Sequence, residues 1–321
     1  MSTGHGRRLA RRMVALLCIG FGWLTRLMPL RLARALAVGL AVVAYVAVPR
    51  IRRVGMANLD AAYGEILSVR EKRRILWGAV RNAAMVAAEF SHIPTLAGGG
   101  DERLVRVEGL EHVDLSKGLI GIGAHLGNWE WMAPAMAAHG CHVTAVVRPL
   151  DDPVLNRYVD GVRRAGDVDT LDKDAAAQAL VRVLREGGKA GLLVDQSPRE
   201  NGVPATFFGR SCWATAGPAL VARRARVPVH PVCMVRGAHG GYTLRFSPEV
   251  ALEKTQHLRR DLQVNSQRFQ DAIEEMVRAH PEQWLWFHRR WKPRPRLRTM
   301  WEEHLGRERP KEQETAVEHD L

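Results

Sequence analysis

The residues best suited to acid–base chemistry are His125 and Glu130, within the stretch G-A-H-L-G-N-W-E at residues 123–130. The apolar, glycine-punctuated run at residues 118–123 predicts a buried strand that ends just before the histidine. Apolar residues at helical spacing follow Asn128 and predict a helix. The histidine therefore lies where a strand is followed by a helix, which is the usual place for chemistry in an α/β sheet.

A histidine oriented by a carboxylate is a general base that can take a proton from a hydroxyl group. Residues five apart in one helix point about 140° away from each other. The side chains of His125 and Glu130 can therefore converge only if the histidine precedes the helix. Free backbone N–H groups at the same helix start could stabilise an oxyanion. A His–Glu pair at this spacing also arises by chance, but the flanking glycines and the strand-to-helix junction favour the catalytic interpretation.

Polar residues follow two further predicted strands. Arg148 ends the strand after the histidine helix, and Asp195-Gln196 end the apolar strand at residues 192–194. Carboxyl ends of strands in such sheets face the ligand crevice. Arg148 and Arg164 could bind a phosphate, or could simply be solvated. Asp195 could instead cap a neighbouring backbone segment.

Aromatic residues mark two segments that could contact lipid. Phe207 and Phe208 lie in an otherwise polar segment, residues 197–211, and exposed phenylalanines there would indicate contact with an acyl chain or a membrane. The alternative is that both rings fold back onto the core. Three tryptophans within residues 284–291 lie among basic residues, which suits a membrane-interface belt or a packing lid.

The order of predicted elements indicates an α/β fold. From Val105 onward strands alternate with helices, which predicts a mostly parallel sheet flanked by helices, with an antiparallel edge hairpin through Gly237–Gly241. Ser68 is the expected N-cap of a helix that extends to Ser91. The predicted divisions are a membrane anchor at 1–53, a helical linker region at 54–100 ending in a glycine-rich joint, the α/β domain at 101–296, and a charged, disordered tail at 297–321.

The N-terminal segment contains two apolar runs, residues 13–24 and 35–48, with arginines on both sides. Each run is shorter than the ~20 residues that cross a bilayer. A cleaved signal peptide and a buried helix pair are two possible interpretations. We favour a third, an anchor that lies in or dips into the membrane, with its arginines at anionic headgroups.

The composition of the chain narrows the classes of molecule that it is expected to bind. The net charge of +13 indicates an acidic partner or an anionic membrane surface. Nucleic acid is not expected, because no zinc-finger, RNP-type or KH-type signature is present and the basic residues are spread through the chain. The four cysteines are far apart with no metal-binding spacing, so we expect reduced core thiols and no metal site.

Several ordered motifs resemble the bacterial lipid A biosynthesis acyltransferases, the late enzymes that add lauroyl or myristoyl chains. They are A-H-L-G-N-W-E, V-V-R-P-L-D-D-P, L-L-V-D-Q-S, F-F-G-R with A-T-A-G-P-A-L, and H-P-E-Q-W-L-W-F-H-R-R-W-K. The resemblance extends from about Arg53 to Arg296. The wider glycerolipid acyltransferase group shares only the H-x4-D/E element.

The resemblance implies a role for each matching position. It makes His125 the general base, Glu130 its acidic partner, and Asn128 a residue that helps bind substrate. Other positions expected around the substrate, from the resemblance or from the residues themselves, are Arg148, Arg164, Asp195, Gln196, Phe207 and Phe208.

The resemblance further implies acyl-carrier-protein thioesters as donors, no metal or other cofactor, and a catalytic domain at the cytoplasmic face of the inner membrane. An acidic carrier protein suits the charge of +13. Related actinobacterial enzymes acylate phosphatidylinositol mannosides from acyl-CoA. A lipid A precursor is therefore the predicted acceptor, another glycolipid or phospholipid is the alternative, and a non-catalytic lipid-binding scaffold is the alternative from a different class.

Overall fold

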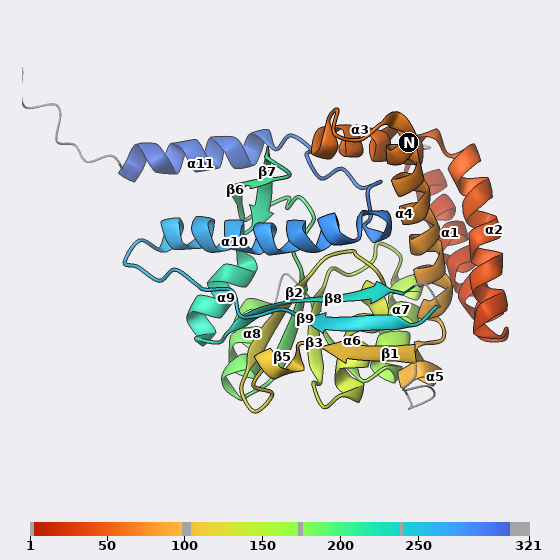
Figure 1. The fold of residues 1–321 in the computed structure, drawn as a ribbon, viewed down its shortest axis with the longest axis horizontal. Coiled ribbons are helices and arrows are strands. Elements are labelled where there is room, and N and C mark those ends of the chain that lie inside the picture. Colours follow the sequence, from red (N-terminus) through yellow and green to blue (C-terminus); the bar gives the residue numbers. More distant parts are fainter. Residues whose placement is uncertain (1–2, 98–103, 173–175, 238–239, 309–321) are drawn as a thin grey trace, which may run out of the picture.

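A mixed β-sheet forms the centre of the computed structural model, which describes residues 3–97, 104–172, 176–237 and 240–308. Within these residues the sheet has seven strands in the order β1-β9-β8-β2-β5-β3-β4 (Figure 1). The strands are β1 (Val105–Glu108), β2 (Leu119–Gly123), β3 (Val143–Val147), β4 (Val168–Asp172), β5 (Lys189–Leu193), β8 (Val229–Arg236) and β9 (Tyr242–Phe246). Strands β8, β2, β5, β3 and β4 are mutually parallel, which confirms the predicted α/β fold.

The predicted hairpin is formed by β8 and β9, which pair antiparallel. It does not lie at the edge, however, because β1 pairs in parallel with β9 and covers it. A second, two-stranded sheet is formed by β6 (Gly202–Phe207) and β7 (Arg210–Thr215). The sequence prediction of a polar loop at 197–211 missed this hairpin, since its alternation of buried and exposed residues extends over only a few positions.

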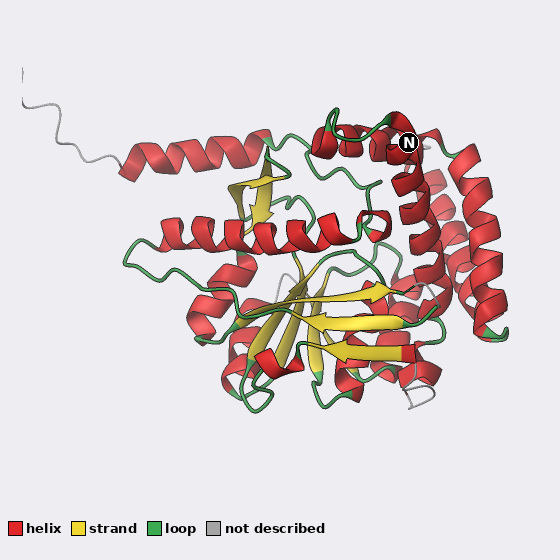
Figure 2. Cartoon of the chain, in the orientation of Figure 1, coloured by secondary structure: helices red, strands yellow, loops and turns green. Residues whose placement is uncertain are grey.

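Helices cover both faces of the sheet (Figure 2). In chain order they are α1 (Thr3–Arg26), α2 (Leu30–Ala47), α3 (Pro49–Tyr63), α4 (Val69–Phe90), α5 (Ile93–Ala97), α6 (Trp129–Ala138), α7 (Pro153–Ala165), α8 (Ala176–Arg185), α9 (Gly217–Ala225), α10 (Leu258–Ala279) and α11 (Pro295–Glu308), with short 3-10 turns η2 (Leu110–His112) and η3 (Pro281–Gln283). Helix α11 occupies much of the segment expected to be a disordered tail. The glycine-rich joint and the last 13 residues lie outside the described residues.

Helix α4 begins where the sequence predicts. The Ser68 side chain accepts a hydrogen bond from the backbone N–H of Glu71, and the Glu71 carboxylate accepts one from the backbone N–H of Ser68 at 2.8 Å. This capping box satisfies two donors that the first helical turn leaves unpaired. It fixes the start of a helix that supplies the buried Glu89 to the candidate site.

Helices α1 and α2 expose much of their apolar surface. One stripe of α2, formed by Ala33, Ala37 and Ala41, is buried, while Leu32 and Val43 are 55% and 62% exposed. Among the described residues, α2 is the one helix long and apolar enough to cross a membrane, and 17% of its residues are buried. A buried helix pair is therefore not what the N-terminal segment forms.

Three of the four cysteines lie in the core as free thiols, as predicted, and the fourth does not. Cys141, Cys212 and Cys233 are buried free thiols, and Cys18 is exposed on α1.

Candidate active site

His125 lies in the loop between β2 and α6, as the sequence predicts. Its ring Nδ1 is 2.8 Å from Oδ1 of Asp195, and its backbone N–H donates to Oδ2 of the same carboxylate at 3.0 Å. Its carbonyl oxygen accepts from the backbone N–H of Leu285 at 3.1 Å. These three contacts fix both the main chain and the ring of the histidine.

Asp195 can reach His125 because β5, which it follows, is the direct neighbour of β2. The carboxylate is fully buried and also accepts a hydrogen bond from the indole N–H of Trp284 at 2.9 Å. A carboxylate that accepts hydrogen bonds from three N–H groups is held in its ionised form. Because it can only accept, Nδ1 of His125 carries the proton and Nε2 keeps its lone pair.

The electrostatics of the pair agree with this assignment. Burial alone would lower the pKa of His125, but the charge of Asp195, their hydrogen bond and the nearby charge of Glu130 together raise it above its ordinary value. Burial alone would raise the pKa of Asp195, yet His125 and, to a smaller extent, His288 bring it well below the ordinary value. Burial also lowers the pKa of His288. The site therefore holds one ionised carboxylate beside one basic imidazole.

Glu130 does not hydrogen-bond to His125, in contrast to the expectation from the sequence. It lies in the first turn of α6 and forms a two-pronged ion pair with Arg163 of α7, with N–O distances of 2.9–3.1 Å. The helix start turns the carboxylate towards α7, and Asp195 takes the orienting position instead. Glu130 acts on the imidazole through its charge alone.

The arginines predicted near the site are arranged differently from the expectation. Arg163, not the adjacent Arg164, faces Glu130, since neighbouring residues on a helix point about 100° apart, and Arg164 is exposed. Arg148 is also exposed and pairs with Asp151 at 3.2 Å. The exposed Gln196 does reach the centre, with its amide nitrogen 3.3 Å from Nε2 of His125.

The loop that follows His125 is held by main-chain contacts. Gly127 has a φ of +60°, and a Cβ there would lie 1.9 Å from the carbonyl oxygen of Met234. The backbone N–H groups of Gly127 and Asn128 donate to the carbonyls of Gln283 and Met234. Only glycine fits this close approach without strain. The loop is thus clamped between β8 and the segment after η3.

Both ends of the Asn128 side-chain amide form hydrogen bonds within the protein. Its Oδ1 accepts from the backbone N–H of Trp131 and so caps α6, while its Nδ2 donates to Glu89 at 2.7 Å. Its side chain is buried. The next backbone N–H groups, those of Trp129 and Glu130, have no partner among the described residues, as expected for the first turn of a helix.

Glu89 is a buried residue that the sequence reading missed. Its carboxylate, fully shielded from solvent, accepts hydrogen bonds from Arg34 of α2, Arg236 of β8, Asn128 and the Tyr242 hydroxyl. A buried carboxylate is tolerated when it is paired and fully hydrogen-bonded. Glu89 therefore joins α2, α4 and β8 to the loop that carries the histidine. Its only sequence signal was a charge within an otherwise apolar helical stretch.

Comparison with known proteins completes this description. The sequence matches the family described as bacterial lipid A biosynthesis acyltransferase over residues 4–293, which is most of the chain. The chain belongs to this family. It is therefore an acyltransferase of the lipid A biosynthesis type, as the motifs predict.

Curated relatives of this acyltransferase are distant in sequence but similar in length. It is 24% identical over 287 residues to the lipid A biosynthesis lauroyltransferase of Escherichia coli K12, with 86% of this chain and 90% of that protein covered. It is 25% identical over 256 residues to a lipid A biosynthesis acyltransferase of Haemophilus influenzae, with 77% and 80% covered. Among solved structures, a 1-acyl-sn-glycerophosphate acyltransferase from Thermotoga maritima aligns with 76% of this chain and 96% of its own, at 15% identity and a TM-score of 0.35.

The two phenylalanines of the acyltransferase are core residues. Phe207 ends β6 and Phe208 follows it in the turn, and the two are 0% and 5% exposed. Their rings pack against Trp284 and Trp286 at centroid distances of 5.6 and 5.8 Å. The prediction that the phenylalanines are exposed is wrong, because the hairpin folds them onto the tryptophans of the last motif. Those tryptophans are likewise buried, which excludes the membrane-interface belt for them.

Side chains that could ligate a metal do not gather in the part of the chain that the structure describes. Among the described residues there is no group of three or more His, Cys, Asp or Glu side chains that could hold an ion.

Proposed function

We propose that the protein transfers a fatty acyl chain from a thioester donor, acyl-ACP or acyl-CoA, to a hydroxyl of a lipid A precursor. The observation that carries the proposal is the hydrogen bond between His125 and the buried carboxylate of Asp195, which leaves Nε2 as a base. The family membership supplies the reaction type. Together they support Nε2 of His125 as the atom that takes the proton.

In the proposed reaction, Nε2 of His125 takes the proton of the acceptor hydroxyl. The oxygen attacks the thioester carbonyl, and a tetrahedral oxyanion forms. The unpartnered N–H groups of Trp129 and Glu130, at the positive end of α6, are the proposed donors to that oxyanion. The C–S bond then breaks and the thiolate leaves as a thiol with the proton from His125.

The remaining polar residues have supporting roles in this proposal. Asp195 fixes the tautomer and stabilises the imidazolium that forms, as a carboxylate does in other histidine-based sites. Glu130 adds negative charge near the ring and holds the guanidinium of Arg163. Gln196, which is exposed beside Nε2, is placed to contact the acceptor hydroxyl. Arg148 and Arg164, both exposed, remain predictions for binding a phosphate of the substrate.

We further propose that α1 and α2 attach the enzyme to the inner membrane with the catalytic domain on the cytoplasmic side. The apolar exposure of both helices and the hydropathy of α2 support attachment. Both proposed donors are cytoplasmic molecules, which supports the orientation. Amphipathic and apolar helices bind membranes in proportion to the apolar area that they bury.

The test is an acyl-transfer assay in which the purified protein receives acyl-ACP or acyl-CoA thioesters together with total lipid of the host. Mass spectrometry then identifies the lipid that gains an acyl chain. A new acyl group on a lipid A precursor, absent with His125→Ala, is the expected result. Transfer to a mannolipid or glycerolipid would show that the acceptor differs from the proposed one, while the proposed mechanism would still apply. Near-normal turnover by His125→Ala would refute the role of the base, and no transfer from any donor would refute the enzymatic proposal.

A further inference from the structure

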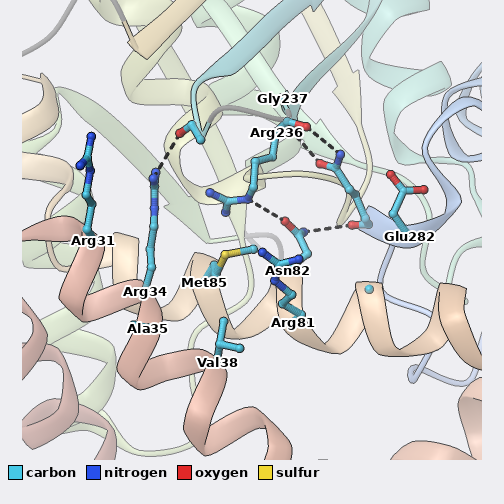
Figure 3. A pocket seen from close by; sticks show the side chains of 13 residues that line it. Arg31, Arg34, Ala35, Val38, Arg81, Asn82, Met85, Arg236, Gly237 and Glu282 are labelled. Carbon is cyan, nitrogen blue, oxygen red and sulfur yellow. Dashed lines mark hydrogen bonds between the residues drawn. The ribbon is translucent and has the colours of Figure 1, made fainter.

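A cavity of about 610 Å³ lies between α2, α4, the end of β8 and η3 (Figure 3). Its volume is within the range of sites for small molecules and lipid headgroups. The residues that line it do not include His125, Glu130, Asp195 or Gln196. The cavity is therefore separate from the proposed reaction centre.

The lining is strongly basic. Four arginines, Arg31, Arg34, Arg81 and Arg236, contribute positive charge, against the single carboxylate of Glu282. Figure 3 shows arginines of α2, α4 and β8 gathered around the same space.

Two of the four arginines are held by an ion pair within the described residues, and the other two are not. Arg34 and Arg236 are held by the buried Glu89, so their positions are fixed by the protein. Arg31 and Arg81 are exposed and form no ion pair with any described residue. The Nη2 atom of Arg34 is also buried without a hydrogen-bond partner among the described residues. The cavity thus has fixed cations at its base and two uncompensated cations at its rim.

The position of the cavity beside α2 indicates the kind of anion. Arg31, Arg34, Ala35 and Val38 line it at the spacing i, i+3, i+4 and i+7, so they form one face of the helix. Neighbouring positions of the same helix, such as Leu40 at 50% exposure, present apolar surface to the outside. An anion in the cavity would lie next to that apolar surface, as a phosphate lies next to acyl chains in a lipid.

We propose that this cavity binds the phosphate group of an anionic phospholipid headgroup. Arginine forms paired, charge-assisted hydrogen bonds with phosphate oxygens. The apolar side chains of Val38 and Met85 in the lining suit the glycerol and the start of the acyl chains. The volume is far larger than an inorganic phosphate requires, which favours a lipid as the source. This site is independent of the acyl-transfer reaction.

The test measures binding of a water-soluble short-chain phosphatidylglycerol to the full-length protein in detergent by isothermal titration calorimetry. The variant is Arg31→Gln with Arg81→Gln, which removes the two unpaired rim cations. The matched control is Arg50→Gln with Arg53→Gln, because these exposed arginines adjoin the other end of α2 and lie outside the cavity lining. A short-chain phosphatidylcholine and inorganic phosphate serve as control titrants.

We expect the Arg31/Arg81 variant to bind phosphatidylglycerol at least about tenfold more weakly than wild type, and the Arg50/Arg53 control to remain within about twofold. Glu282→Gln is expected to tighten binding, since it removes the one anionic group in the lining. His125→Ala is expected to bind like wild type, which separates this proposal from the reaction mechanism.

Three results would overturn the proposal. Equal losses in the two arginine pairs would indicate diffuse attraction to the membrane surface. Equal affinity for phosphatidylcholine would remove the requirement for net negative charge. Inorganic phosphate that binds as tightly as the lipid would make free phosphate, and not a headgroup, the ligand.

Discussion

Replacing Asp195 with Asn tests the assignment of the orienting carboxylate most directly. Asparagine has nearly the same volume but carries an NH₂ group in place of one oxygen. In the native site Oδ2 accepts from the backbone of His125 and from Trp284, and Oδ1 accepts from Nδ1 of His125. The amide oxygen will therefore take the position with two donors. Its NH₂ group then faces Nδ1 of His125.

An NH₂ group beside Nδ1 forces that nitrogen to accept, which moves the proton of His125 to Nε2. The nitrogen that faces the substrate is then no longer a base. General base catalysis contributes about 10²–10⁴-fold, so we expect kcat/KM to fall by that factor. This fall equals about 2.7–5.5 kcal/mol, at 1.36 kcal/mol for each tenfold change. The fold should be retained, because two of the three hydrogen bonds to Asp195 survive in the variant.

The pH profile provides a second readout. A raised pKa of His125 places the acid limb of kcat/KM above pH 6.5 in the wild type, because the base must be deprotonated to act. In Asp195→Asn the carboxylate that contributes most to raising this pKa is gone and burial remains, so the limb should move to lower pH. Initial rates of acyl transfer between pH 5 and 9, with circular dichroism to confirm folding, supply both measurements. Activity within about threefold of wild type and an unshifted limb would refute the assignment of Asp195.

Three further predictions concern the surroundings of the histidine. Glu130→Gln should lower kcat/KM by about 10–100-fold, since hydrogen bonds to charged groups contribute about 1.5–3 kcal/mol. Adding Arg163→Gln to this variant should cause no further loss. Additive losses in this double-mutant cycle would contradict a shared role of the two residues. Gly127→Ala should lower the melting temperature several times more than Gly140→Ala. Both glycines have positive φ, but only at Gly127 would the Cβ collide with a carbonyl. Equal shifts of the melting temperature in calorimetry would contradict the proposed tight fit of the loop after His125. Glu89→Gln should destabilise the fold by about 3–5 kcal/mol, as expected when buried cations lose their partner. A chemical denaturation midpoint equal to that of wild type would show that the hydrogen bonds and ion pairs around Glu89 do not stabilise the fold.

Local sequence signals predicted the elements that carry the site. The apolar strand before His125, the helix after Asn128 and the capping residue Ser68 depend on residues near one another in the chain, and the structure confirms all three. The location of Asp195 at a strand end was also readable. Its pairing with His125 was not, because it requires that β5 be the neighbour of β2, and strand order has no local sequence signal.

The partner of Glu130 was misjudged for a related reason. Periodicity identifies α7 as a helix, but without the crossing geometry it cannot decide whether Arg163 or Arg164 faces the site. The four-partner role of Glu89 depends on contacts from four separate segments. Such a residue looks like an ordinary charge on an amphipathic helix until the tertiary structure is known.

Trp284 also makes the proposed site depend on a segment that is synthesised late. Its indole completes the hydrogen bonds of Asp195, although it lies 89 positions further along the chain. The apolar helices α1 and α2 leave the ribosome first, whereas the His–Asp pair is complete only when the last motif has emerged. The proposed membrane attachment through α1 and α2 can therefore precede assembly of the proposed base during synthesis.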